Sequence, residues 1–428
     1  MRILYFLSFL ILVSCSSTDG GDEVQEAQKS DFPIIMMHGA LGSGDTYATQ
    51  AQRFVSNGYS AELIYAFDWN SLDQLGTPEL ELDVFVENVL TTSGKGKVIL
   101  VGHSAGGNLG YTYLSNAARA EKVERYIHVG SFVNAGPAGP NEEIPTLNLY
   151  SLADEVVDGD DIPGAVNVAL AELDHYQIAT SSESFVEMYK FLNNGNEPLE
   201  DIVEEDNVML SGRVVDLGSN EEQGDVKIEI FKIDENTGGR SSQEAVDELS
   251  TDDNGNWGPW QAEKGQRYEF VISSSQSDFR TLHYYREGFV KSDHLVYLRS
   301  FPPPGSPISI LLGLLPESED QSVFAIFSSN QAVLSGRDEL DFNEFELSTQ
   351  ALASPDQTTI AFFVYDNGDL VSSGNQHLLF GAFPFLNGVD LYTPVENCLI
   401  IPITFNGVTL HAENWKSSNQ GYSIVVFN

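Results

Sequence analysis

Cysteine and basic residues are scarce in this sequence, which argues against a disulfide framework and against nucleic-acid binding. The 428 residues include two cysteines, Cys15 and Cys398, so the fold must rest on its apolar cores rather than on a disulfide framework. Only 21 residues are basic against 63 acidic ones, which gives a formal net charge of −42. Such a surface repels phosphate groups, so nucleic-acid binding is excluded. We interpret the acidic excess as an adaptation for solubility.

Long apolar runs are also missing at the N-terminus, where Ile3–Val13 is too short to stay in a bilayer as a permanent helix. The run follows the basic Arg2 and ends in Leu-Val-Ser-Cys, which is typical of a signal peptide and resembles the lipobox of bacterial lipoproteins. The resemblance implies that residues 1–15 form a lipoprotein signal peptide, that Cys15 is lipidated and that residues 16–30 form a flexible tether. A plain secretory signal is the alternative. Either reading predicts export, with the lipoprotein reading placing the chain at the bacterial outer membrane or cell surface.

Residues 31–195 show alternating strand and helix patterns, which predict a parallel sheet with helices on both faces. We expect strands at 33–37, 61–66, 125–130 and 146–151, with a further strand from 98. We expect helices at 45–57, 108–120 and 182–192, and another that opens at Thr77-Pro78 and stops at Gly94. The fold class is therefore α/β for this domain.

Beyond the acidic stretch at 195–206 the pattern changes to period-two alternation, which predicts all-β structure, either a sandwich or barrel-like. We expect a β-sandwich domain at 207–300 and a second β domain at 301–428, separated by a proline-rich segment. The expected strands are 208–216, 226–233, 268–273, 308–312, 323–327, 360–365, 399–405 and 422–427.

The segment Val98–Gly107 carries the strongest chemical signal. Four apolar β-formers run into Gly-x-Ser-x-Gly, with Gly102, Ser104 and Gly106 at the fixed positions and a helical pattern behind them. This context is typical of the nucleophile elbow of α/β-hydrolases. Glycines on either side of the nucleophile keep side chains from colliding in the tight turn. The pattern therefore predicts Ser104 as a catalytic nucleophile.

Histidine is scarce, and this narrows the choice of a general base. The chain holds eight histidines, and after Ser104 the first domain has only His128 and His175. His128 lies within a predicted core strand, whereas His175 lies in a loop before the last predicted helix. In this fold the triad follows the order serine, acid, histidine. We therefore assign His175 as the general base.

The acid is expected on the loop after the strand at 146–151. Asp154 lies on that loop, close enough to the strand end for its carboxylate to point back toward His175. The same loop carries three rival acids, which also fit a solvated acidic surface: Asp158, Asp160 and Asp161. We assign Asp154 as the residue that orients the base.

Two backbone N–H groups are expected to bind the oxyanion. One should come from Ala105, directly after the nucleophile, and the other from Ala40 beside Gly39 in the loop at 38–43. We interpret His38 as a brace for this loop and His103 as a packing or pocket residue. No His, Cys and Asp cluster has zinc-ligand spacing, so we expect neither a metal nor a cofactor.

These motifs together resemble bacterial and archaeal true lipases. The first domain is similar to small, lidless bacterial lipases. Most of residues 31–428 is similar to archaeal lipases whose hydrolase domain precedes a lipid-binding β domain, and this likeness includes 283–290 and 421–427. The resemblance implies an α/β-hydrolase catalytic domain at 31–195 and lipid binding at 301–428.

Two departures from the archaeal pattern matter. The archaeal acid is at the end of the preceding strand, where this chain has Gly130, so Asp154 follows the small bacterial lipases. The segment between Phe67 and Val98 is too short for a large lid, which argues against interfacial activation.

We expect an exported serine hydrolase that cleaves carboxylic esters, acting as a lipase or carboxylesterase on acylglycerols, with no required protein partner. An extracellular polyester depolymerase is one alternative, because a lidless site would admit polymer chains. A non-catalytic lipoprotein that binds lipid or glycan is the other. Its candidate exposed aromatics, which also fit a core, are Trp257, Trp260, Tyr284 and Tyr285.

Overall fold

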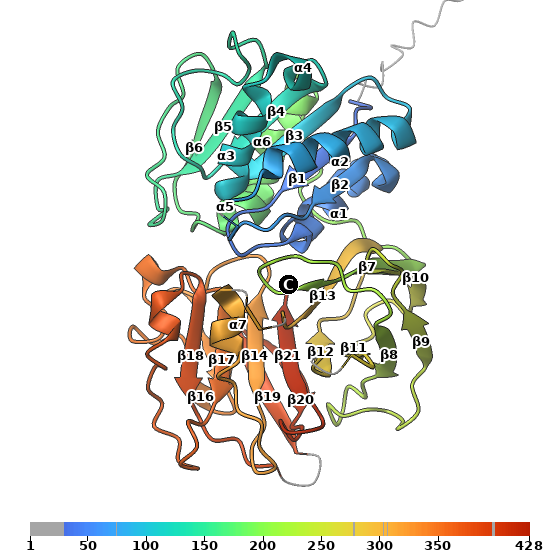
Figure 1. Cartoon of the computed structure of the whole chain (residues 1–428), viewed down its shortest axis with the longest axis vertical. Helices are drawn as coiled ribbons and strands as arrows, with labels where there is room; N and C mark the ends of the chain where they lie inside the picture. Colours follow the sequence, from blue (N-terminus) through green and yellow to red (C-terminus); the bar gives the residue numbers. More distant parts are fainter. Residues whose placement is uncertain (1–29, 74, 277–278, 303, 306, 396–398) are drawn as a thin grey trace, which may run out of the picture.

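A six-stranded parallel sheet forms the N-terminal part of the computed structural model, which describes residues 30–73, 75–276, 279–302, 304–305, 307–395 and 399–428. The strand order is β2-β1-β3-β4-β5-β6 (Figure 1). The strands are β1 Ile34–Met37, β2 Ile64–Phe67, β3 Val98–His103, β4 Val123–Val129, β5 Thr146–Ser151 and β6 Val166–Leu170. The α/β fold class predicted for this region is confirmed. The signal peptide and Cys15 lie outside the described residues.

Helices cover both faces of this sheet, and β1 shows why. Ile34 and Met36 pack on the face covered by α1 and α6, whereas Ile35 and Met37 pack on the face covered by α2 and α3. A strand buried on both sides is a continuous apolar run rather than an alternating one. The helical segments are η1 Gly44–Tyr47, α1 Ala48–Ser56, η2 Ala61–Leu63, α2 Pro78–Ser93, α3 Ala105–Leu114, α4 Ala117–Ala120, α5 Gln177–Thr180 and α6 Ser182–Leu192.

The helix expected at 108–120 is two helices, because Asn116 interrupts it. The Asn116 side chain accepts hydrogen bonds from the amides of Ala118 and Arg119 and caps α4. By contrast, α2 has the predicted ends, with Pro78 in its first turn and Gly94 at φ 67 after its last residue.

Residues 207–428 form three sheets in the described part of the chain, with orders β10-β7-β13, β18-β17-β14-β21-β12-β11-β8-β9 and β16-β15-β19-β20. The strands of the first half are β7 Val208–Asp216, β8 Lys227–Lys232, β9 Asp247–Ser250, β10 Asn256–Ala262, β11 Tyr268–Ser273, β12 Leu282–Arg286 and β13 Asp293–Ser300. The second half has β14 Phe324–Ser328, β15 Leu340–Phe342, β16 Phe345–Glu346, β17 Ala361–Tyr365, β18 Leu386–Asp390, β19 Ile400–Phe405, β20 Val408–Glu413 and β21 Tyr422–Phe427. Three short helical segments are interspersed: α7 Pro307–Leu312, η3 Pro355–Gln357 and η4 Phe380–Ala382.

The boundary expected at residue 301 does not separate two β domains. The last strand, β21, lies between β12 and β14 and runs parallel to both, so one sheet contains strands from either side of the boundary. One apolar core likewise includes Phe270 and Leu282 together with Phe363 and Ile424. A proline-rich segment marks a local break in the pattern, but it carries no information about pairing between distant strands.

One other prediction in this region is wrong, and one question that the sequence left open is answered. The strand expected at 308–312 is helix α7, which illustrates that a short apolar run does not distinguish strand from helix. Three of the four aromatics offered as surface binders are core residues: Trp257, Tyr284 and Tyr285 are each no more than 3% exposed. Trp260 is half-buried and packs against the same core.

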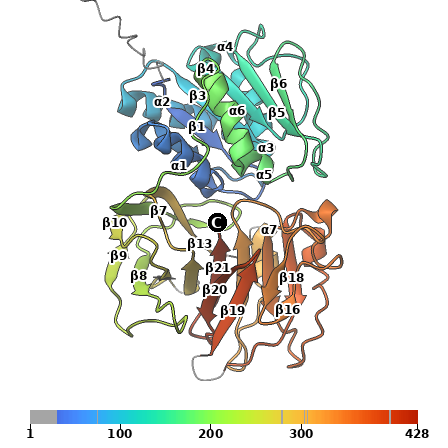
Figure 2. The same ribbon diagram turned by 180° about the vertical axis from the view of Figure 1, so that it is seen from behind.

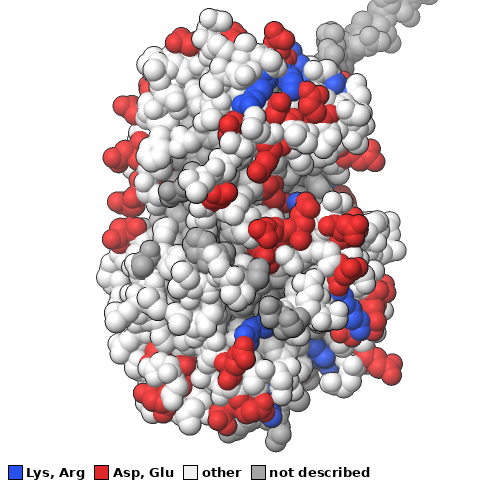
Figure 3. Space-filling model, in the orientation of Figure 1, with Lys and Arg blue, Asp and Glu red and all other residues white. Residues whose placement is uncertain are grey.

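The β region sits directly against the carboxyl-end side of the parallel sheet (Figures 1 and 2). Val215 of β7 and Leu295 and Tyr297 of β13 belong to the same apolar cluster as the helices α1 and α6. Acidic side chains are spread over both halves of the face in Figure 3, whereas basic ones are few. No helix among the described residues has both the length and the apolar character needed to cross a membrane.

Candidate active site

The turn between β3 and α3 presents Ser104 at the carboxyl edge of the sheet. Ser104 has φ 52 and ψ −119. This backbone conformation is unfavourable for any residue other than glycine. A Cβ on Gly106 would lie 2.3 Å from the carbonyl oxygen of Met37, and one on Gly102 would lie 2.4 Å from that of Gly106. Glycine at both positions therefore allows α3 to approach the sheet closely enough to hold this turn.

His175 connects Ser104 to Asp154. The His175 Nε2 atom lies 3.0 Å from the Ser104 Oγ atom, and the Nδ1 atom lies 2.7 Å from the Asp154 Oδ2 atom. Because the carboxylate can only accept, Nδ1 carries the proton and Nε2 accepts from the serine hydroxyl. The side chains of His175 and Asp154 are 3% and 1% exposed. The arrangement is that of a nucleophile, a base and an orienting acid.

The Asp154 carboxylate is held in its charged form. Its Oδ1 atom accepts hydrogen bonds from the amides of Val156 and Val157 at 2.8 and 3.0 Å. Burial raises the pKa of Asp154, but the hydrogen bonds and charge of His175 and the two amides outweigh burial, so the pKa lies below its ordinary value. The charged carboxylate fixes the orientation of the His175 ring through its hydrogen bond to Nδ1.

The three rival acids on this loop face elsewhere. Asp161 accepts a hydrogen bond from the Tyr150 hydroxyl at 2.9 Å, and Asp158 and Asp160 are exposed. Among the described residues, the hydrogen-bonding partners of the His175 ring are Ser104 and Asp154.

The two expected oxyanion donors flank Ser104. Ala105 is the first residue of α3, and the first N–H groups of a helix have no partner within the helix. Ala40 lines the pocket that contains Ser104, together with Gly39. The amides of the next two residues, Leu41 and Gly42, donate to Ser71 Oγ and to the Gly39 carbonyl, so these two amides already have partners.

His38 and His103, the two histidines near the triad, are buried and form hydrogen bonds with backbone groups. The His38 ring hydrogen bonds to the Gly39 carbonyl at 2.8 Å through Nδ1, while its Nε2 atom accepts from the Trp69 amide at 3.3 Å. The His103 Nε2 atom lies 2.8 Å from the His175 carbonyl oxygen. Burial, aided by the charge of His175, lowers the pKa of His103 to about 3, so this ring is neutral and supports the loop of the base.

Two parts of the chain match known protein families. Residues 33–169 match the family model described as alpha/beta hydrolase fold, and residues 206–303 match the one described as lipase C-terminal domain. The chain thus combines an α/β-hydrolase fold with a region that matches a lipase C-terminal domain. Its sequence and fold support ester hydrolysis of the lipase and esterase type.

Solved structures with a similar fold include two hydrolases. A mature lipase of Bacillus licheniformis is 19% identical, with a TM-score of 0.28, over 37% of this chain and 91% of the lipase. An esterase from a marine microorganism is 14% identical, with a TM-score of 0.30, over 38% of this chain and 96% of the esterase. Neither likeness bears on what this hydrolase acts on.

The hydrolase pocket around Ser104 has walls from both halves of the chain. Thr358, Ile360 and Phe385 of the β region line it together with Ser104 and His175. The Phe385 ring is stacked on the His175 ring, with centroids 6.0 Å apart and planes 10° apart. Sequence reasoning missed this wall, because no local motif indicates which loop of a distant sheet will cover the site.

The β region also holds the loops that carry the site. The Asn220 Nδ2 atom donates to the carbonyl oxygens of Gly42 and Trp69 at 2.9 and 3.0 Å, which fixes the oxyanion loop. Arg337 forms an ion pair with Asp174, the neighbour of His175, at 2.8 Å. The hydrolase domain therefore depends on the β region for the position of both loops. Among the described residues, no group of three or more His, Cys, Asp or Glu is placed to hold a metal ion.

Proposed function

We propose that the chain is a serine carboxylic ester hydrolase that uses Ser104, His175 and Asp154 as its triad. The observation that supports this most directly is the continuous hydrogen-bonded path from the Ser104 hydroxyl through the His175 ring to the Asp154 carboxylate. The lipase C-terminal domain match favours acyl esters of the acylglycerol type as substrates.

The proposal assigns each step of the reaction to named residues. The Ser104 Oγ atom attacks the ester carbonyl carbon while His175 Nε2 takes the hydroxyl proton. The amides of Ala40 and Ala105 stabilise the negative charge on the carbonyl oxygen. The bond to the alcohol breaks as His175 returns the proton to the leaving oxygen. Water deprotonated by His175 then cleaves the acyl-enzyme, which releases the acid and restores Ser104.

The shape of the pocket favours small esters over an open polymer site. Phe385 and its neighbours cover the side of Ser104 that the short segment before β3 would otherwise leave open. This wall narrows the access to Ser104, which disfavours the depolymerase alternative, because that alternative rested on an open site.

Export and lipid anchoring through Cys15 complete the proposal. They rest on the signal-like segment and the Leu-Val-Ser-Cys sequence at 12–15. Metabolic labelling with a radioactive fatty acid, compared between the wild-type chain and Cys15→Ser, tests this part separately. Equal labelling of the two would contradict it.

The triad is tested by hydrolysis of p-nitrophenyl esters from acetate to palmitate by the full chain. We expect Ser104→Ala to lower kcat by about 10⁴-fold or more, and Asp154→Asn by about 10³- to 10⁴-fold, without unfolding the protein. Asp161→Asn is the matched control on the same loop and should keep wild-type kcat. Near-wild-type turnover by Ser104→Ala would contradict the proposed nucleophile.

A further inference from the structure

A second cavity lies between the two halves of the molecule, next to the pocket of Ser104. Counting space that is open to solvent, it spans about 660 Å³, and Gly42, Tyr176 and Ile360 line both spaces. Because the two spaces share these residues, an ester whose carbonyl lies at Ser104 can point one end toward this cavity. Most of its apolar lining comes from the β region, including Leu217, Phe327, Leu386 and Val426.

One wall of this cavity carries a buried guanidinium group with unused donors. Arg286 of β12 is 7% exposed, and its Nη2 atom donates to the Tyr297 carbonyl oxygen at 2.7 Å. Its Nε atom has no hydrogen-bond partner among the described residues. Arg286 is on the same side of β12 as Tyr284, which also lines the cavity, whereas Tyr285 packs into a different core. A guanidinium offers five donors in a planar fork, and most of these remain available here.

The two arginines that line the cavity differ in their partners. Arg299 forms an ion pair with Asp45. Asp293 is another buried acid near Arg286, and its carboxylate accepts a hydrogen bond from the Leu295 amide at 2.8 Å. No ion pair links Arg286 to a carboxylate in the part of the chain that the structure describes. Arg286 therefore has no direct anionic partner at the wall of the cavity.

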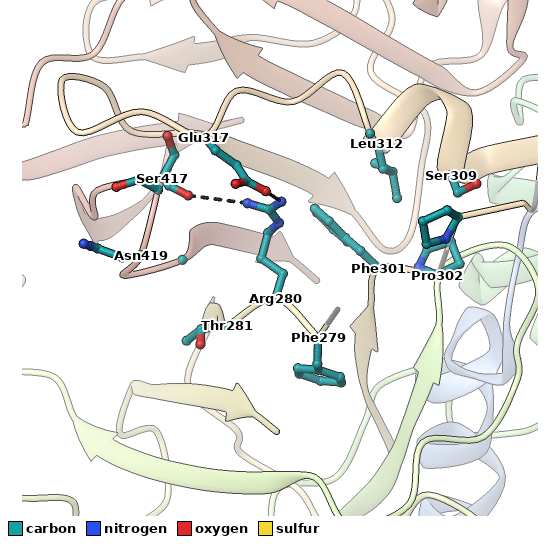
Figure 4. A pocket seen from close by; sticks show the side chains of 14 residues that line it. Phe279, Arg280, Thr281, Phe301, Pro302, Ser309, Leu312, Glu317, Ser417 and Asn419 are labelled. Atoms are coloured by element: carbon teal, nitrogen blue, oxygen red, sulfur yellow. Dashed lines mark hydrogen bonds and ion pairs between the residues drawn. The ribbon is translucent and has the colours of Figure 1, made fainter. Parts of the chain in front are cut away.

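Arg280, near the start of β12, provides a comparison because its guanidinium group has an ion-pair partner. In the open groove of Figure 4 its guanidinium points at Glu317, with which it forms an ion pair, and it also donates to the Ser417 carbonyl oxygen at 3.4 Å. That groove offers no uncompensated charge, and it shares none of the residues that line the Ser104 pocket. Arg286 differs because it is buried, has no ion pair among the described residues and lines the cavity next to the Ser104 pocket.

We propose that the cavity is a carboxylate subsite, which makes the preferred substrates esters whose acyl chain ends in a second carboxylate. The methylene chain would lie along the apolar lining, and the two oxygens of the terminal carboxylate would accept hydrogen bonds from the Arg286 guanidinium. The hydrolysis products are then an alcohol and a dicarboxylate. This inference rests on the proposed function, because it assumes ester cleavage at Ser104.

The test compares three substrates of matched acyl length with the full chain. They are p-nitrophenyl octanoate, the mono-p-nitrophenyl ester of octanedioic acid, and the methyl ester of the latter, which has similar size but no charge. We expect kcat/KM for the carboxylate-bearing ester to exceed that for the other two by about 10- to 100-fold. Arg286→Met should reduce this preference to near one, whereas Arg280→Met, the matched control, should retain it.

The outcomes separate the two proposals. If the wild type hydrolyses none of the three esters, or if hydrolysis persists in Ser104→Ala, the proposed function is contradicted. Ser104-dependent hydrolysis without a preference for the carboxylate, or a preference that survives Arg286→Met, overturns the subsite alone. If Arg286→Met does not fold, product inhibition of the wild type decides: octanedioate should inhibit octanoate ester hydrolysis at least 10-fold more strongly than octanoate does, and equal inhibition overturns the subsite.

Discussion

At the residue scale, positions 130 and 154 lie close together, so a carboxylate at either one could reach the catalytic histidine. A Cβ on Gly130, at the end of β4, would lie 3.7 Å from the Asp154 Oδ2 atom. The archaeal lipases that the sequence resembles carry their acid at the position of Gly130. A carboxylate reaching from either strand end therefore meets the same nitrogen of His175. This explains how the chain can lack an acid at 130 and still place one against its base.

Asp216, at the end of β7, is expected to make the stability of the protein depend on pH. Burial raises the pKa of Asp216 to about 6 from its ordinary 3.8, and the Oδ2 atom has no partner among the described residues. Its contribution to stability is full below pH 3.8 and is lost as the pH rises through about 6. We expect Asp216→Asn to stabilise the protein at pH 8 by about 1–2 kcal/mol, a Tm increase of a few degrees, but not at pH 4.

Thermal unfolding of Asp216→Asn and the wild type at both pH values measures this difference. The strong net negative charge affects both proteins almost equally, so it largely cancels in the comparison. Asp158→Asn removes a charge at an exposed position and should shift Tm little at either pH. A Tm gain for Asp216→Asn that is the same at pH 4 and pH 8 would show that burial of the charge is not its cause.

At the scale of elements, the sequence predicted those whose ends carry local chemical signals. The strands β5, β7, β11 and β21 and the helix α6 have the expected bounds, and the elbow has the expected strand, turn and helix. The strand β6 was missed because it lies at the sheet edge, where Val166 and Ala169 are exposed, and because Asn167 interrupts its apolar residues. Local patterns also could not indicate that α7 is a helix, since its six residues suit either form.

Asn220, in the turn after β7, is expected to affect catalysis by positioning the oxyanion loop. Asn220 has φ 59, is buried, and donates through Nδ2 to Gly42 and Trp69 on the oxyanion loop. Asn220→Ala removes these bonds and should lower kcat about 10-fold with little change in KM, because the loop acts on the transition state rather than on bound substrate. Steady-state kinetics on one p-nitrophenyl ester measures both parameters.

Asn220→Gly separates the side chain from the backbone. Glycine adopts positive φ without strain, so this variant keeps the turn but lacks the donor. We expect its kcat to be as low as that of Asn220→Ala. Wild-type kcat in the glycine variant would mean that backbone conformation, and not the bonds of Asn220, places the oxyanion loop.

At the scale of the whole molecule, the site was predictable only in the part that one domain supplies. The triad residues Ser104, Asp154 and His175 follow local rules of strand, turn and order, and the structure brings all three together. Phe385 and Arg286 come from strands or loops whose approach to the site depends on pairing between distant segments. Sequence pattern has no period or motif that encodes such an approach, so the pocket wall and the second cavity were not foreseen.

This shared architecture makes the β region a structural part of the hydrolase rather than a removable module. Val215, Leu295 and Tyr297 complete the apolar cluster beneath α1 and α6, and Asp68 accepts hydrogen bonds from Tyr297 and Arg213 at 2.6 Å each. A chain that ends at residue 195 would expose that apolar surface and remove the Tyr297 and Arg213 partners of Asp68. We therefore expect it to lack a cooperative thermal transition and to lose ester hydrolysis.

A second truncation after residue 303 distinguishes loss of the family-matched domain from loss of the joint sheet. It keeps all of residues 206–303 but removes β21, which separates β12 from β14 in the intact sheet. Because β12 then loses its neighbour, and the Phe385 wall is absent, we expect this chain to fail as well. Near-ultraviolet circular dichroism and p-nitrophenyl ester hydrolysis, with the full chain as reference, measure folding and activity. A cooperatively folded, fully active truncation at 303 would contradict the view that strands on both sides of residue 301 form one folding unit.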